Sequence, residues 1–329
     1  MKKVFFAAFV LLIVMGFAAC SNKQVPVSTV NLQLQNSVDS LLKQGMGEYG
    51  ATEGMAIVVK TSTGNLRAMV GLKENNGKLV SDTTLFSKAR ETFLFRSASL
   101  LAALETGNVS LDDMFDTYTG IDVVGQDTIY DHNWRKGGYG ELTLLQGLAY
   151  NSSIAIDKAV DVAYQDKDVF LQKLEQMGLE KDSTFKGSWP LYALGFHHIK
   201  PVNFVSFFNA IANGGKMVSL KSQDSSAIVV DSMIAEKKNI ESMKKAFRFY
   251  VTNGLGKKAE SKMVNVAGTS GTIHTDDGIY ADFCGYFPVE KPKYTVFVSY
   301  KRPEIPVSGG GMAGQTFRKI AEQIMKTCK

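Results

Sequence analysis

An apolar stretch with one charge inside it constrains this chain more than any other feature. Residues 89–107 read ARETFLFRSASLLAALETG, and the apolar side chains fall on every side of a 3.6-residue period. This pattern predicts a helix that begins just after Thr92, is buried nearly all round and ends at Gly107. Arg96 lies within the run. A buried guanidinium needs a carboxylate partner or an anionic ligand, because an unpaired one costs several kcal/mol.

The first twenty residues predict export and lipidation. Lys2 and Lys3 precede an apolar run over 4–15, which is too short to span a membrane and is followed by small residues and Cys20. This arrangement is typical of a cleaved signal peptide. The small residues before Cys20 resemble a lipoprotein lipobox, with Phe17 in place of the more usual Leu. The resemblance implies an exported protein, anchored through Cys20 to a bacterial membrane and facing the periplasm. The alternative is an ordinary signal peptide followed by an unrelated Cys.

The remaining sequence indicates one folded unit. We expect residues 1–19 to be the signal peptide, 20–29 a polar tether and 30–329 one large domain. The formal net charge of +5 is spread along the chain without a basic patch, which argues against a nucleic-acid partner. Cys and His residues lack metal-ligand spacing, so we expect neither metal nor cofactor. With Cys20 acylated, Cys284 and Cys328 either pair or stay as buried thiols.

Strand and helix patterns are segregated along the chain. We expect a hairpin over 56–70, loops over 71–82 and 120–141, strands at MVNVAG, YADFCGYF and KYTVFVSY, and helices over 30–46, 142–163, 166–177, 201–213, 234–252 and 312–326. Early strands, a helical middle and late strands predict an α+β fold. Its antiparallel sheet is built from both chain ends, with packed helices and a mostly helical lobe.

The order of these segments resembles the transpeptidase domain of class B penicillin-binding proteins over nearly the whole mature chain. The segments that carry the resemblance are KTSTGNLRAMV, LTLLQGLAYNSSIAIDKAV, IKPVNFVSFFNAIANGG, YVTNGLGKKA, VAGTSGT, GYFPVEKPKYTVFVSY and SGGGMAGQTFRKIAEQI. The resemblance implies a β-lactamase/transpeptidase-like fold and a role at the cell wall. In that family the chemistry rests on three motifs, which are Ser-x-x-Lys, Ser-x-Asn and Lys-Thr/Ser-Gly-Thr.

All three motifs are degraded in this sequence. Counted back from Gly107, the nucleophile position falls on Phe93 and the lysine position on Arg96. The second motif reads Asn-Ser-Ser over 151–153, and the third keeps Ser-Gly-Thr but begins with Thr269 in place of Lys. Phe has no nucleophilic atom, and Arg is not deprotonated in proteins. Loss of the nucleophile costs roughly 10⁶ in rate in comparable serine proteases.

We therefore predict a non-catalytic relative that acts as a cell-wall scaffold or binding module. The expected partner is peptidoglycan stem peptide or a cell-wall protein. The candidate ligand-binding residues are Arg96, Ser153, Ser270 and Thr272, because the family's third-motif hydroxyls contact a substrate carboxylate and a guanidinium fork binds carboxylates. For Arg96, the alternative is a structural pairing with a carboxylate behind the cleft.

Two other functional hypotheses stay open. An active D,D-transpeptidase or carboxypeptidase that binds penicillin would need another serine, such as Ser97 or Ser183. Ser183 begins a literal STFK, and Ser-x-x-Lys also occurs at Ser40 and Ser242, but these matches lie outside the expected buried helix. An enzyme of unrelated class would need a new set of convergent titratable groups, and no motif points to one.

Overall fold

The computed structural model describes residues 28–223 and 226–327. The expected signal peptide, Cys20 with its expected lipid, and Cys328 lie outside these ranges. Cys284 is fully buried, and burial raises the pKa of its thiol well above the usual value. No helix in the described part of the chain has the length and apolarity that crossing a bilayer requires.

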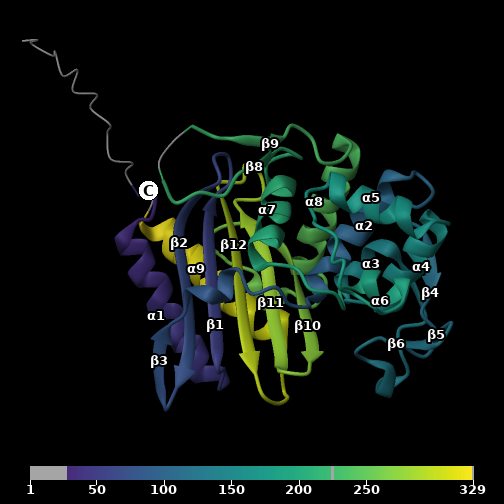
Figure 1. Ribbon diagram of the computed structural model, residues 1–329, viewed down its shortest axis with the longest axis horizontal. Helices are drawn as coiled ribbons and strands as arrows, with labels where there is room; N and C mark the ends of the chain where they lie inside the picture. The colour runs from purple at the N-terminus through teal and green to yellow at the C-terminus, as the bar shows by residue number, and fades with distance from the viewer. Residues whose placement is uncertain (1–27, 224–225, 328–329) are drawn as a thin grey trace, which may run out of the picture.

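A six-stranded antiparallel sheet forms the centre of the molecule (Figure 1). Its order is β10-β11-β12-β1-β2-β3. The strands are β1 (Glu53–Lys60), β2 (Asn65–Asn75), β3 (Lys78–Ser81), β10 (Ala267–Thr275), β11 (Gly278–Phe287) and β12 (Tyr294–Arg302). Strands β1 and β12 are neighbours, with Ile57 opposite Phe297, so the two chain ends meet in the middle of the sheet. The predicted α+β fold with a sheet from both chain ends is confirmed.

Both faces of the sheet are covered, which explains the nearly continuous apolar sequence of β1. Helices α1 (Leu32–Tyr49) and α9 (Gly314–Thr327) pack on one face against Ala56 and Val58. On the other face, Ile57 and Val59 belong to a core shared with the helical lobe. The helices of that lobe are α2 (Arg96–Glu105), α3 (Leu144–Ala149), α4 (Ser153–Ala163), α5 (Lys167–Gln176), α6 (Trp189–Leu194), α7 (Pro201–Ala212) and α8 (Lys237–Thr252).

The structure corrects four element boundaries. An extra strand, β3, follows a tight turn in which Asn76 and Gly77 both have positive φ, as an Asn-Gly hairpin requires. The expected loop over 120–141 contains the hairpin of β5 (Ile121–Val124) and β6 (Asp127–Tyr130). The expected helix over 142–163 is two helices, and the strand expected at 263–268 runs instead through the polar residues of β10. Short pairs β4 (Met114–Asp116) with β7 (Glu141–Thr143), and β8 (Met217–Val218) with β9 (Val229–Asp231), complete the strands of the described residues.

A buried ion pair anchors the segment before α2 to the sheet. Arg90 donates from Nη1 and Nη2 to the two carboxylate oxygens of Asp282 on β11, at 2.9 and 2.8 Å. Thr92 Oγ1 donates to the same carboxylate at 2.8 Å, and Ser299 Oγ accepts from Arg90 at 3.0 Å. A bidentate pair with further hydrogen bonds is the geometry in which burial of two charges is compensated. It fixes the point at which the chain turns into α2.

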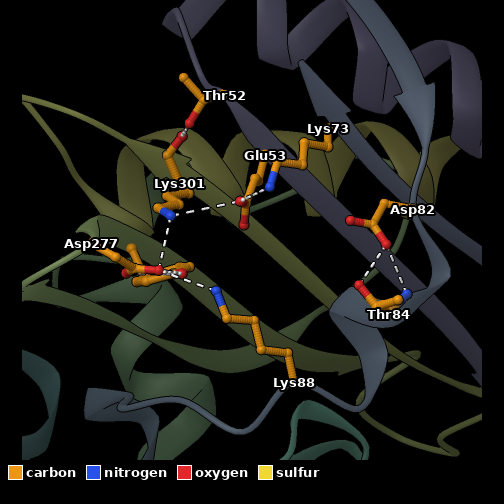
Figure 2. A network of polar contacts seen from close by, with 9 residues as sticks. Thr52, Glu53, Lys73, Asp82, Thr84, Lys88, Asp277 and Lys301 are labelled. Atoms are coloured by element: carbon orange, nitrogen blue, oxygen red, sulfur yellow. Dashed lines mark hydrogen bonds and ion pairs between the residues drawn. The ribbon is translucent and has the colours of Figure 1, made fainter. Parts of the chain in front are cut away.

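A more exposed network of charges ties the same segment to the β10–β11 turn and to strands β1 and β12 (Figure 2). Lys88 and Lys301 donate to Asp277, at 3.2 and 3.0 Å, and Lys301 also faces Glu53 at 3.6 Å. Burial alone raises the pKa of Asp277, but hydrogen bonds from Lys301, Thr275 and Lys88 outweigh it and lower that pKa well below its usual value. These contacts bring the β10–β11 turn against the segment that leads to α2.

We expect Asp282→Ala to lower the free energy of unfolding by about 3–5 kcal/mol, because it leaves Arg90 buried without its partner. Urea unfolding of the purified chain measures the effect. Asp39 on α1 is the matched control, because its ion pair with Lys43 is exposed and its loss costs at most about 1 kcal/mol. Equal midpoints for Asp282→Ala and Asp39→Ala contradict the anchoring role.

Candidate functional site

A cavity of about 410 Å³ lies where β10, the start of α2 and the α3–α4 junction meet. This volume is in the range of small-molecule sites. Its lining residues in the described chain are Phe93, Arg96, Tyr130, Asp131, His132, Trp134, Asn151, Ser153, Leu255, Ser270, Thr272, His274, Val307, Ser308 and Gly310.

The structure brings six of the seven predicted site residues together around this cavity. They come from three separate parts of the chain and are Phe93, Arg96, Asn151, Ser153, Ser270 and Thr272. Thr269 is buried but is not part of the lining. On β10 the lining residues alternate as 270, 272 and 274, as side chains on one face of a strand do.

Gly271 allows β10 to lie directly against residue 93. A Cβ atom at Gly271 would lie 2.9 Å from the backbone N of Leu94 and 3.1 Å from the carbonyl carbon of Phe93. The next residue, Thr272, accepts a hydrogen bond from the backbone N–H of Gly309 at 2.9 Å. The third motif therefore lies between the start of α2 and the Gly-rich turn before α9.

Arg96 is a buried cation without a carboxylate partner. The residue is 6% exposed, and its Nη1 donates to the backbone oxygen of Asn151 at 2.7 Å. The guanidinium carbon lies 3.9 Å from the centre of the Phe93 ring, a cation–π contact. Its Nε has no hydrogen-bond partner, and no salt bridge among the described residues includes it. Burial lowers its pKa to about 10, against the opposing effect of Asp131 and Tyr250, so it stays charged at neutral pH.

Asp131 fixes the first turn of α4 beside Arg96. Its carboxylate accepts from Ser152 Oγ at 2.7 Å and from the backbone N–H groups of Ser153 and Ile154 at 2.7 and 3.3 Å. Burial raises the pKa of Asp131, and these hydrogen bonds oppose the change. A carboxylate at a helix N-terminus is also favoured by the helix dipole. Asp131 thus satisfies the helix end, and sequence reasoning missed it because it lies in a stretch assigned as a loop.

Tyr250 connects the second and third motifs from α8. Its hydroxyl is hydrogen-bonded to Ser270 Oγ, and Asn151 Nδ2 faces both hydroxyl oxygens at 3.4 and 3.5 Å. Burial raises the pKa of Tyr250, so it is neutral at physiological pH. Ser270 therefore has a phenol and an amide as partners, and neither is a general base. Tyr250 was also missed, because no local sequence signal links α8 to β10.

Phe93 also lines a second, more apolar cavity of about 220 Å³. Its ring packs edge-to-face against Phe196, with centroids 5.1 Å apart. Leu191 and Leu194 of α6 line the second cavity together with Phe196. Phe93, Tyr130, Ser153 and His274 border both spaces. The site thus combines a polar part around Arg96 with an adjoining apolar part.

Comparison with known proteins gives the family. The sequence model described as penicillin binding protein transpeptidase domain matches residues 54–325. The chain belongs to this family.

Solved structures of similar fold agree with the assignment. A peptidoglycan glycosyltransferase from Burkholderia ambifaria has a TM-score of 0.79 at 19% identity, covering 92% of this chain and 98% of that one. The TP domain of Burkholderia pseudomallei penicillin-binding protein 3 has a TM-score of 0.79 at 18% identity, covering 93% and 97%. The transpeptidase domain of the FtsI4 D,D-transpeptidase from Legionella pneumophila has 0.68 at 20% identity, covering 92% and 100%. At these identities the likeness shows the fold alone.

The other serines considered for the family chemistry lie away from the cavity lining. Ser97 is buried in α2 with its hydroxyl unpartnered, and Ser183 is exposed in the loop after α5. Ser40 lies on α1, on the opposite face of the sheet, and Ser242 on α8 donates to the backbone oxygen of Lys238. Among the described residues, the lining contains no Lys. The same part of the chain shows no cluster of three or more His, Cys, Asp or Glu suited to a metal.

Asp157 lies one turn after Ser153, and the cost of burying its carboxyl group is not offset by a hydrogen bond at Oδ1. It is 4% exposed, and its Oδ1 has no partner. Burial raises its pKa to about 7, and the nearby Asp161 and Asp122 add to the effect. The folded chain therefore keeps this proton up to a higher pH than the unfolded chain, in which Asp titrates near 3.9. The protonated carboxyl group of Asp157 therefore contributes favourably to the free energy of unfolding below about pH 4, and this contribution is lost as the pH rises to about 7.

We expect Asp157→Asn to increase the free energy of unfolding at pH 8 by a few kcal/mol and to leave it nearly unchanged at pH 4. The measurement is urea unfolding at a series of pH values. Asp112→Asn is the control, because Asp112 is exposed. If Asp157→Asn and Asp112→Asn have the same pH dependence, the carboxyl of Asp157 is ionised in the folded chain and the assignment is wrong.

Proposed function

We propose that this member of the family is a non-catalytic, lipid-anchored protein that binds a ligand at the cell wall. One observation carries the proposal. Phe93 contacts β10 and borders the cavity at the position that the family motif gives to the nucleophilic serine, with Arg96 at the position of its lysine. The penicillin-binding transpeptidase framework supports the cell-wall role.

The chemistry of acyl transfer in this family needs an activated serine, and the residues at the family's motif positions, Phe93 and Arg96, do not supply one. A serine attacks only when an adjacent base removes its proton. Arg96 holds its proton at neutral pH, and Ser270 is hydrogen-bonded to Tyr250. The carboxylate beside Ser153 is Asp131, and it contacts the backbone N–H of Ser153. It also accepts hydrogen bonds from Ser152 Oγ and the backbone N–H of Ile154, so its oxygens are already occupied at the start of α4.

The same geometry favours binding of a carboxylate. Arg96 contributes a charged guanidinium to the cavity wall, and the hydroxyl-bearing residues Ser270 and Thr272 lie on the facing strand. A charge-assisted hydrogen bond in such a setting is stronger than a neutral one. The apolar cavity beyond Phe93 accommodates an aliphatic side chain. A peptidoglycan stem peptide, with a terminal carboxylate and alkyl side chains, meets both requirements, and a protein segment with the same groups is the other occupant.

Export and anchoring are part of this proposal. The signal-like residues 1–19 and the Cys at position 20 support a mature chain that carries lipid on Cys20. A lipid there would hold the domain at a bacterial membrane, on the periplasmic side.

We expect a fluorescent penicillin to leave the purified full-length chain unlabelled after denaturation, because no serine is activated. A catalytically active penicillin-binding protein treated in parallel shows that the reagent works. Covalent labelling overturns the proposal. Labelling that disappears in Ser97→Ala or in Ser183→Ala alone would identify the serine of an active enzyme.

We expect Arg96→Met to weaken binding of a stem peptide with a free terminal carboxylate by about 10- to 100-fold, in line with loss of one charged hydrogen-bonding partner. Calorimetric titration measures the change. The corresponding peptide amide should bind the parent chain as weakly as the acid binds Arg96→Met. Arg67→Met is the control, because Arg67 lies on β2, with three strands between it and β10. Equal affinities for acid and amide contradict a role for Arg96 in carboxylate binding.

A further inference from the structure

Several apolar residues close together in the sequence are exposed on and beside β9 (Val229–Asp231). Ile228, Val229, Val230 and Met233 are 57, 46, 62 and 46% exposed. Single exposed apolar residues are common in soluble domains, but several close together mark a surface that binds another protein or a membrane. We call these four residues the β9 patch. Strand β9 pairs only with the two-residue strand β8 among the described residues, so its outer side is not covered.

The β9 patch lies beside the point where the N-terminal segment joins the domain. Ser28 forms a β-bridge with Gln223, and the backbone N–H of Thr29 donates to the oxygen of Ser222 at 2.8 Å. Thr29 Oγ1 also donates to the backbone oxygen of Lys221 at 3.2 Å. The first described residues are thus bonded to the hairpin that carries the patch, and β8 and β9 lie together along the upper edge of the molecule in Figure 1.

Covalent geometry limits how far a lipid on Cys20 can be from this edge. Cys20 precedes Ser28 by eight positions. A chain of that length spans at most about 28 Å when fully extended. If Cys20 is lipidated, as the proposed function requires, the bilayer surface must lie within that distance of the hairpin.

We propose that the β9 patch docks into the surface of the bilayer that holds the lipid anchor. Four medium-sized apolar side chains on and beside a short strand suit shallow insertion at the headgroup boundary. The exposed Lys237 and Lys238 follow at the start of α8 and suit anionic headgroups, although Lys238 is paired with Glu236 at 3.0 Å. This inference rests on the lipidation of Cys20 but is independent of what binds in the cavity.

Docking through this edge orients the cavity. Hairpin β5–β6, which contributes Tyr130 to the lining and directly precedes Asp131, lies at the lower right in Figure 1, far from β9 in that view. A domain held by the β9 patch would therefore present its cavity away from the lipid surface, toward the cell wall.

The test places a probe on the patch of the lipidated full-length chain. Val230→Cys and Val123→Cys, each combined with Cys328→Ser, are labelled with an environment-sensitive fluorophore, while Cys284 is fully buried. Val123 is the matched control, because it is also a valine on a short strand and is 68% exposed. Both proteins are reconstituted in phosphatidylethanolamine–phosphatidylglycerol vesicles that contain brominated lipid. We expect several-fold stronger quenching at position 230 than at position 123.

A second variant separates docking from simple tethering. Adding Ile228→Asp and Val229→Asp to the Val230→Cys chain should reduce its quenching to the level of the control position, because the exposed side chains no longer favour lipid. Equal quenching at 230 and 123, or quenching at 230 that survives the two aspartates, overturns the docking. Mass analysis of the N-terminal peptide of the same samples reports acylation. An unmodified Cys20 contradicts the anchoring and the docking together, whereas acylation with equal quenching contradicts the docking alone.

Discussion

The site depends on the buried ion pair between Arg90 and Asp282. It joins the segment before α2 to β11, the middle strand of the three C-terminal strands. Thr92, which caps the helical turn over Phe93–Phe95, donates to the same carboxylate. Because Gly271 permits contact between β10 and Phe93, the distance between the first and third motifs is set by backbone packing. Backbone contacts therefore hold the first and third motifs together.

Arg96 and Asp131 show how two opposite charges share one wall without forming an ion pair. Asp131 is occupied by Ser152 and by the N-terminus of α4, and Arg96 by the backbone oxygen of Asn151 and the face of Phe93. Their attraction persists, since each lowers the cost of burying the other. The oxygens of Asp131, however, accept their hydrogen bonds from the start of α4. The Nε of Arg96 is therefore left without a hydrogen-bond partner. Under the proposed function, the positive charge of Arg96 is what attracts an external anion to this wall.

Much of the fold could be predicted from the sequence, because apolar periodicity and the order of segments are local signals. The helix after Thr92 and the central strands lie close to their expected positions. Strand β10 was placed too early because its outward residues, such as Ser270 and Thr272, face the cavity and carry no apolar signal. The helix expected over 142–163 is interrupted at Asn151, where φ is 54°. The helical spacing of apolar residues continues on both sides of Asn151, so it could not predict this interruption. Tyr250 and Asp131 belong to the site because they contact residues that are distant in the sequence. Local sequence patterns do not predict such contacts.

The unpaired donor on Arg96 links ligand binding to stability under the proposed function. A buried charge that lacks a full set of partners destabilises the folded chain, and an anion that satisfies it restores part of that loss. A ligand that binds only the folded state also shifts unfolding by mass action, in proportion to the logarithm of its concentration relative to Kd. The neighbouring apolar cavity adds binding energy that does not depend on charge. Affinity and specificity would then come from different walls of one site, with Arg96 selecting the anion and the Phe196 side selecting the apolar group.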